Sequence, residues 1–277
     1  MKDFHLHTRF GDGKNSVNEM VKAATEAGFC EIAFTEHFTW FFTELKKYGI
    51  GSPVTIMPEE IFDYFAQCRD AEQKYGIKVL KGFEIGYLEK DRKDTLRLIE
   101  KVKPDLLLLA VHHLELLKDW KREDGSLQKK GWSLYASEDT FAEMIKQYGG
   151  FHNVCERYFK RLNNAVEAGF ENLAPRVGVA HLCIFESEKG SDRNTLSPYI
   201  DNTIENIANR GLALELNFHY FQSHKRSRPD FVAARIYKER GGKELWFGSD
   251  SHTKESIAQA AELYPIFQDL LRQQDFI

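Results

Sequence analysis

The chain alternates short apolar segments with amphipathic stretches, and this rhythm most limits how it can fold. Each apolar segment has the length of a buried strand, and the stretch after the first opens with the capping-box pattern Ser16-Val17-Asn18-Glu19. Strands that alternate with helices form parallel sheets covered by helices. Seven such units without a dividing linker predict one α/β domain over residues 1–277, a closed or nearly closed (β/α) barrel. The predicted strands are Asp3–His7, Glu31–Phe34, Lys78–Ile85, Leu106–Val111, Val177–Ala180, Leu212–Leu216 and Leu245–Phe247.

Charge and composition exclude several classes of protein. The 277 residues carry a net charge of −4, so the chain lacks the basic field that holds nucleic acid. No apolar run approaches the roughly 18–20 residues of a membrane span, and the first residues show no secretory signal pattern. The four cysteines have no framework spacing, which is typical of reduced thiols in the cytoplasm. We therefore expect a cytoplasmic protein with no nucleic-acid or membrane partner, while the oligomeric state stays open.

Histidines gather where the predicted strands end. His5 and His7 close the first strand, and a spacing of two places both side chains on one face. Because the carboxyl ends of barrel strands meet at one mouth, these residues should converge with others that hold the same position. The others are His37, Glu84, His112, His181, Asp250 and His252.

So many imidazoles in one place need compensation, because burial and mutual repulsion would destabilise them. Divalent metal ions provide it, since neutral imidazole and carboxylate are ordinary ligands of Zn, Mn and Fe. The ligands outnumber the needs of one ion, so we predict two or three ions, bridged by Glu84, which stands alone at its strand end. A single His-X-His pair or strand-end histidine would more often be a structural residue.

The motifs, in their order, resemble those of the PHP superfamily, the polymerase-and-histidinol-phosphatase hydrolases. The resemblance extends from residue 3 to about residue 260 and implies a distorted (β/α)7 TIM-like barrel with three metal ions at its C-terminal mouth. Within the superfamily it is greatest to histidinol-phosphate phosphatases, through residues 82–88, 109–114 and 214–217. The motifs are His5-Leu6-His7-Thr8, Thr35-Glu36-His37, Gly82-Phe83-Glu84, Val111-His112-His113, the lone His181, and Gly248-Ser249-Asp250-Ser251-His252.

The resemblance also implies how the ligands divide. The first ion would take His5, His7, Glu84 and Asp250. The second would share Glu84 and add His112 and His181. The third would take His37, His252 and a residue in the loop after His7, where Asp12 fills the slot; Asp12 could instead be an ordinary turn residue.

A centre of this kind suits hydrolysis of a phosphate monoester, with Glu84, Asp250 and His252 as the catalytic candidates. The expected substrate is a small phosphorylated molecule, L-histidinol phosphate by the resemblance, in histidine biosynthesis. The alternatives are a different phosphorylated metabolite or nucleotide, and a non-catalytic metal-binding regulator. Phosphate recognition calls for arginine or lysine. The substrate-binding candidates are Arg226 and Arg228, in the basic loop after the sixth strand, together with His113 and His219.

Overall fold

The computed structural model contains one seven-stranded sheet in which all neighbouring strands are parallel. It describes residues 1–47, 54–115, 117–118, 120–121, 127–128, 132–134, 138–182, 193–219, 221, 225 and 227–276. All seven predicted strands are confirmed, and they lie in the order β1-β2-β3-β4-β9-β10-β11. Their bounds are β1 Lys2–Leu6, β2 Glu31–Phe38, β3 Lys78–Gly86, β4 Leu106–Ala110, β9 Arg176–Val179, β10 Ala213–Asn217 and β11 Leu245–Gly248.

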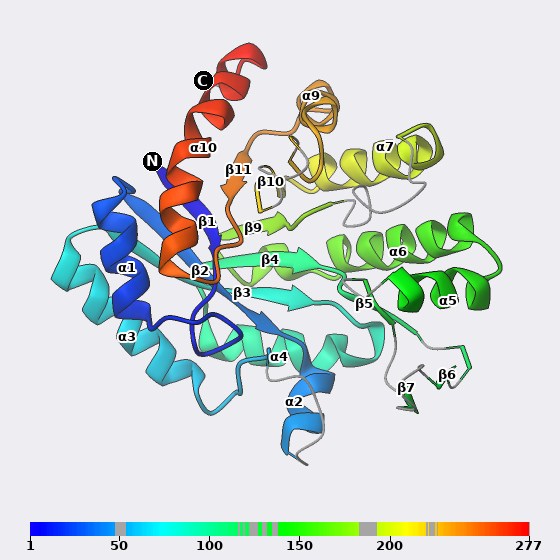
Figure 1. Ribbon diagram of the computed structural model, residues 1–277, viewed down its shortest axis with the longest axis horizontal. Coiled ribbons are helices and arrows are strands. Elements are labelled where there is room, and N and C mark those ends of the chain that lie inside the picture. Colours follow the sequence, from blue (N-terminus) through cyan, green and yellow to red (C-terminus); the bar gives the residue numbers. More distant parts are fainter. Residues whose placement is uncertain are drawn as a thin grey trace.

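Helices cover the outer face of the sheet. Figure 1 shows α1, α3 and α10 together on one side and α5, α6 and α7 on the opposite side. The capping box predicted at Ser16 is present, with Glu19 as its partner. Among the described residues, none of the helices has the length and apolar character that would let it span a membrane. The helices are α1 Val17–Glu26, α2 Trp40–Lys47, α3 Ile61–Tyr75, α4 Arg92–Val102, α5 Glu138–Tyr148, α6 Phe151–Val166, α7 Arg193–Asn209, α9 Phe231–Glu239 and α10 Lys254–Gln273, with single turns η1 Glu89–Asp91 and η2 Phe170–Asn172.

Short strands follow β4 on the way to α5. They form two antiparallel pairs, β5 with β8 and β6 with β7. Their bounds are β5 His113–Leu114, β6 Trp120–Lys121, β7 Leu127–Gln128 and β8 Trp132–Ser133.

The inward face of the sheet changes character along each strand. In β4, Leu106, Leu108 and Ala110 belong to a small inner cluster, whereas Leu107 and Leu109 pack with the helices in the main core. The ring centroids of Phe4 and Trp246 lie 5.2 Å apart in the inner cluster. Because side chains alternate along a strand, the inward position two residues after Ala110 falls to His112. The inner face is therefore apolar at one end and polar at the carboxyl end.

The sheet is nearly closed between β1 and β11. Leu6 and Ser251 form an isolated parallel bridge, and the Asp250 amide donates a 2.8 Å hydrogen bond to the carbonyl of His5. Asp3 contributes a further link, because one of its carboxylate oxygens accepts from the amides of both His5 and Ser249. These bonds join the two ends of the sheet into the expected barrel.

Strand β2 is longer than predicted. It continues through Phe38, which pairs with Ile85 of β3, so His37 lies within the strand rather than after it. In the same register His37 stands beside Glu84.

Candidate metal centre

Glu84 occupies the middle of the polar end of the barrel. It is fully buried on β3, and five imidazoles lie within 4 Å of its carboxylate. Its Oε1 lies 2.5 Å from His181 Nε2 and 2.9 Å from His112 Nε2. Its Oε2 lies 2.7 Å from His37 Nδ1 and 3.4 Å from His5 Nε2. Glu84, the residue expected to bridge two ions, thus lies beside histidines that four other strands position.

Strand β1 and the end of β11 supply a second part of the cluster. His5 Nε2 and His7 Nε2 are 3.0 Å apart, and Asp250 Oδ1 lies 3.2 Å from His7 Nε2. The strand is irregular between Asp3 and Leu6, where the pairing with β2 shifts in register. This irregularity places Phe4 in the inner cluster while both histidines still reach the centre.

The loop after His7 supplies the third part. Asp12 Oδ1 lies 3.1 Å from His252 Nε2, and Asp12 Oδ2 lies 3.7 Å from His37 Nε2. The ring of His7 stacks between those of His37 and His252, with centroids 4.4 and 4.3 Å away. Asp12 therefore lies beside the two histidines with which the sequence associated it, rather than on an open surface turn.

The separations of the ligand atoms fit shared metal ions. Two atoms that each lie about 2.1 Å from one ion are about 3.0–3.4 Å apart at common coordination angles. The His5–His7 pair at 3.0 Å and the His112–His181 pair at 3.3 Å fall in this range. Glu84 Oε2 and His37 Nδ1, although 2.7 Å apart, are not oriented for a hydrogen bond, and neither buried atom makes one in the part of the chain described. Cations between these atoms would satisfy them.

The charge states of Glu84 and His7 suit metal binding. Burial would raise the pKa of Glu84, but the neighbouring imidazoles His112 and His37 outweigh it and hold that pKa well below its ordinary value. Burial and the nearby His252 lower the pKa of His7 to about 3, so His7 is neutral and can offer a lone pair to a metal. The centre thus presents the ionised carboxylate of Glu84 near the neutral imidazole of His7, and both are donor types that Zn, Mn or Fe bind.

Two of the proposed ligands adopt left-handed backbone conformations. His181 has φ 27° and Asp250 has φ 54°, and each lies two residues beyond the end of a strand. Such conformations are uncommon for residues other than glycine and are often found at functional sites. They turn both side chains toward the centre.

Two buried glutamates of the site received no role from sequence reasoning. Glu36 accepts hydrogen bonds from the Thr8 amide and hydroxyl at 2.9 and 2.6 Å, so it anchors the loop that carries Asp12. Burial raises the pKa of Glu36 to about 8. Glu215 of β10 lies 2.5 Å from His5 Nδ1. The sequence did contain a signal for Glu215: it lies two positions after Ala213 in the same strand, so its side chain should face the inside of the barrel as that of Ala213 does.

The substrate-binding candidates lie around this centre in different settings. His219 is exposed, and its Nδ1 lies 3.1 Å from the Asp250 carbonyl. His113 is half-buried, its ring is 4.7 Å from that of Phe42, and burial together with His112 lowers its pKa to about 3. Arg228 is buried and pairs through its backbone with Asn217. Arg226 lies outside the described residues.

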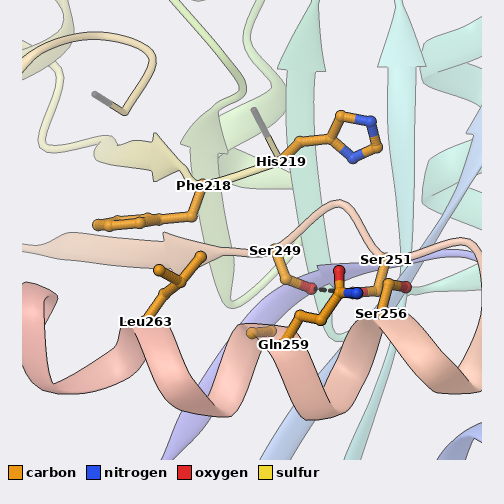
Figure 2. A pocket seen from close by; sticks show the side chains of 8 residues that line it. Phe218, His219, Ser249, Ser251, Ser256, Gln259 and Leu263 are labelled. Carbon is orange, nitrogen blue, oxygen red and sulfur yellow. Dashed lines mark hydrogen bonds between the residues drawn. The ribbon is translucent and has the colours of Figure 1, made fainter. Parts of the chain in front are cut away.

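A pocket of about 260 Å³ adjoins the centre through His219. Figure 2 shows Ser249, Ser251 and Gln259 on one side of it, with Phe218 over Leu263, while the His219 ring points away from the serines. The hydroxyls of Ser249 and Ser251 are 2.7 Å apart and bond to each other.

Fold and site together define a metallohydrolase-like (β/α) barrel with clustered ligands at the carboxyl ends of its strands. The PHP domain family matches residues 3–219, which is more than half of the chain. The chain therefore belongs to the PHP family. Asp250 and His252 lie beyond the matched segment, and the fold brings them to the other proposed ligands.

Individual relatives extend over nearly the whole chain. A Clostridium acetobutylicum protein named "Probable histidinol-phosphatase" is 24% identical over 278 residues, covering 96% of this chain and 95% of its own. A crystal structure of a proposed histidinol phosphatase from Listeria monocytogenes has a TM-score of 0.75 at 22% identity, covering 95% and 100% of the two chains. That of the Lactococcus lactis histidinol phosphate phosphatase, complexed with Zn, L-histidinol and phosphate, has a TM-score of 0.70 at 20% identity, covering 100% and 94%. At these identities the structures support the same fold.

Proposed function

We propose that this protein is a metal-dependent phosphomonoesterase that hydrolyses L-histidinol phosphate to L-histidinol and phosphate, as a cytoplasmic enzyme of histidine biosynthesis. The observation that carries the proposal is the ligand cluster around Glu84, which has the composition and spacing for more than one divalent ion. The named relatives, matched over nearly the full chain, support the choice of substrate.

Three groups of side chains would hold the ions, and the first two share Glu84. His5, His7, Glu84 and Asp250 form the first, and Glu84, His112 and His181 form the second. Asp12, His37 and His252 form the third. Ions bound there would supply an activated water molecule and neutralise charge on the phosphate oxygens.

The chain's own residues hold these groups in place. His252 has close partners at both ring nitrogens: Nε2 lies 3.1 Å from Asp12 and Nδ1 lies 2.8 Å from the Asp250 carbonyl. This double engagement favours His252 as a ligand over His252 as the proton donor to the leaving alkoxide. Glu36 keeps the Asp12 loop against the centre through its two bonds to Thr8.

The organic part of the substrate would lie at the rim. Phe42 and His113 pack edge to face next to His112, and a pKa near 3 keeps His113 neutral, so this pair suits contact with a ring rather than with phosphate. The exposed His219 stands on the other side of the mouth, 6.2 Å from His252 between ring centroids. Of the two arginines expected to bind the phosphate, Arg228 lies among the residues that the structure describes.

The proposal is tested by phosphate release from a panel of monoesters. Metal-loaded protein would be incubated with L-histidinol phosphate, nucleoside monophosphates, sugar phosphates and phosphotyrosine peptide. We expect kcat/KM for histidinol phosphate to exceed that for every other member by at least about tenfold. Equal or higher activity on another monoester would reassign the substrate, and no release from any monoester would reject the phosphatase function.

A further inference from the structure

Glu215 is a buried carboxylate that lies outside the proposed ligand set. It interrupts an otherwise apolar segment between Leu214 and Leu216 and is fully buried on β10. Burying a charged group is costly unless it is well paired. Both of its oxygens are paired, and both partners belong to residues proposed to bind metal: Oε1 lies 2.5 Å from His5 Nδ1, and Oε2 accepts from the His181 amide at 2.6 Å.

The first contact determines which nitrogen of His5 carries the proton. Three carboxylates face the ring of His5: those of Glu84 and Asp250 lie at Nε2, and that of Glu215 lies at Nδ1. A carboxylate only accepts, so its 2.5 Å contact requires a proton on His5 Nδ1. The Nε2 lone pair is then left for a metal, toward His7, Glu84 and Asp250.

The second contact acts on the backbone of another ligand. His181 follows β9 in a left-handed conformation with φ 27°, and its amide points to Glu215 Oε2. That bond holds the turn from which the His181 ring reaches Glu84. One carboxylate therefore constrains two ligands that are far apart in the sequence.

The side chain reaches His5 by crossing a neighbouring strand. Strand β11 lies beside β10 in the sheet and, on its other side, adjoins β1 where the barrel closes; Gly248 is the last residue of β11. A Cβ added at Gly248 would overlap Glu215 Oε1 and lie 2.6 Å from its Cδ. Residue 248 must leave this space open for the carboxylate to pass.

We propose that Glu215 is a positioning residue that fixes the tautomer of His5 and the backbone of His181, and that glycine is required at position 248 to let it reach both. The inference rests on the proposed metal site, and it explains why glycine stands at position 248, the first residue of the Gly248–His252 motif. It does not depend on which monoester is the substrate.

The isosteric change Glu215→Gln separates this role from simple packing. The native site needs two acceptors, one for His5 Nδ1–H and one for the His181 amide, and a carboxamide offers one acceptor and one donor. Either the amide NH₂ faces His5 and favours the other tautomer, or it faces the His181 N–H. Loss of such an orienting partner typically weakens metal binding about 10–100-fold.

The experiment begins with the unaltered protein loaded with Zn. Two-dimensional ¹⁵N–¹H spectra of its histidine rings should show His5 protonated at Nδ1. A His5 ring protonated at Nε2, or lacking a proton on Nδ1, would overturn the inference without any variant. This readout needs no substrate, so phosphatase failure and failure of the inference remain distinguishable.

Metal competition with a chromophoric chelator then compares variants. We expect E215Q to bind its weakest-held ion about 10–100-fold less tightly than the parent, while the matched surface variant E26Q is unchanged. E215D, which keeps two acceptors on a shorter side chain, should recover part of the loss. Parent-like affinity in folded E215Q, within about twofold, would reduce Glu215 to a structural residue.

The variant Gly248→Ala, in the neighbouring strand, tests the second half of the proposal independently. It should weaken metal binding in the parent, because the new methyl group displaces Glu215. In an E215A background that methyl meets no carboxylate, so the additional loss should largely vanish. Equal losses in both backgrounds would show that Gly248 acts independently of Glu215 and would overturn that half of the inference.

Discussion

Replacing Glu84 by glutamine removes one of the two oxygens around which the centre is built. Oε1 has imidazole nitrogens at 2.5 and 2.9 Å, and Oε2 has them at 2.7 and 3.4 Å. Whichever way the amide of E84Q lies, its NH₂ group faces two of these nitrogens and cannot bind a metal. At least one ion therefore loses a ligand.

The expected cost follows from that loss. Removing partners that only orient metal ligands costs 10–100-fold in affinity or activity, so removal of a ligand atom should cost at least about 100-fold, close to 3 kcal/mol. Chelator-stripped E84Q would be titrated calorimetrically with Zn or Mn, and ions per chain would be counted by mass spectrometry. We expect at least one ion to be lost or weakened by about 100-fold, with a similar or larger fall in kcat.

The matched control is E255Q, at an exposed carboxylate in the first turn of α10. It should match the parent in ion count and activity. If E84Q also retained the full number of ions, parent-like affinity and parent-like turnover, Glu84 would not be the bridge and the proposed arrangement of ligands would be wrong.

Further predictions concern stability and pH. Arg161 is buried and forms ion pairs with two carboxylates that are about 40% exposed, so R161M should lower the free energy of unfolding in urea by about 1–3 kcal/mol, and a change below about 0.5 kcal/mol would contradict this. In the metal-free protein, burial lowers the pKa of His252, but the interaction with Asp12 outweighs it and raises that pKa to about 9. The pairing of protonated His252 with Asp12 therefore stabilises the folded state fully below pH 6.5, the ordinary pKa of histidine, and this contribution is lost as pH rises through 9. The unfolding free energy should therefore fall less between pH 6.5 and 9.5 in D12N than in the parent; an equal fall would refute the pairing. G82A places a Cβ 2.6 Å from the Leu106 carbonyl, and we expect a thermal denaturation midpoint lowered by the equivalent of about 1–3 kcal/mol; an unchanged midpoint would refute the close packing.

The barrel could be predicted because the alternation of apolar strands and amphipathic helices can be recognised within short segments of the sequence. Segments such as Leu106–Ala110 are apolar on both faces, and the structure shows one face toward the inner cluster and the other toward the helices. The end of β2 could not be predicted in this way, because Thr35-Glu36-His37 does not read as a buried strand. Those residues remain in the strand because the barrel's inner face is polar at the mouth.

The proposed ligands other than Asp12 were accessible to sequence reasoning because they lie near the carboxyl ends of strands, whereas Asp12 lies in a loop and was placed only by the resemblance. The residues that orient them were not, since their partners are distant in the chain: Glu215 lies 210 residues from His5. Glu36 was hidden for another reason, because its role depends on the path of a loop that brings Thr8 over it. The choice between Arg226 and Arg228 as phosphate clamp stays a prediction, since only Arg228 lies among the described residues.

The central claim is that several ions held around Glu84 make this chain a phosphomonoesterase. The most direct measurement is phosphate release from L-histidinol phosphate during stepwise return of Mn or Zn to stripped protein, with ions per chain counted in the same samples. The account predicts negligible turnover in stripped protein and full turnover only when two or more ions are bound per chain. Full turnover with one ion or none, or no turnover with two or more ions bound, would contradict it.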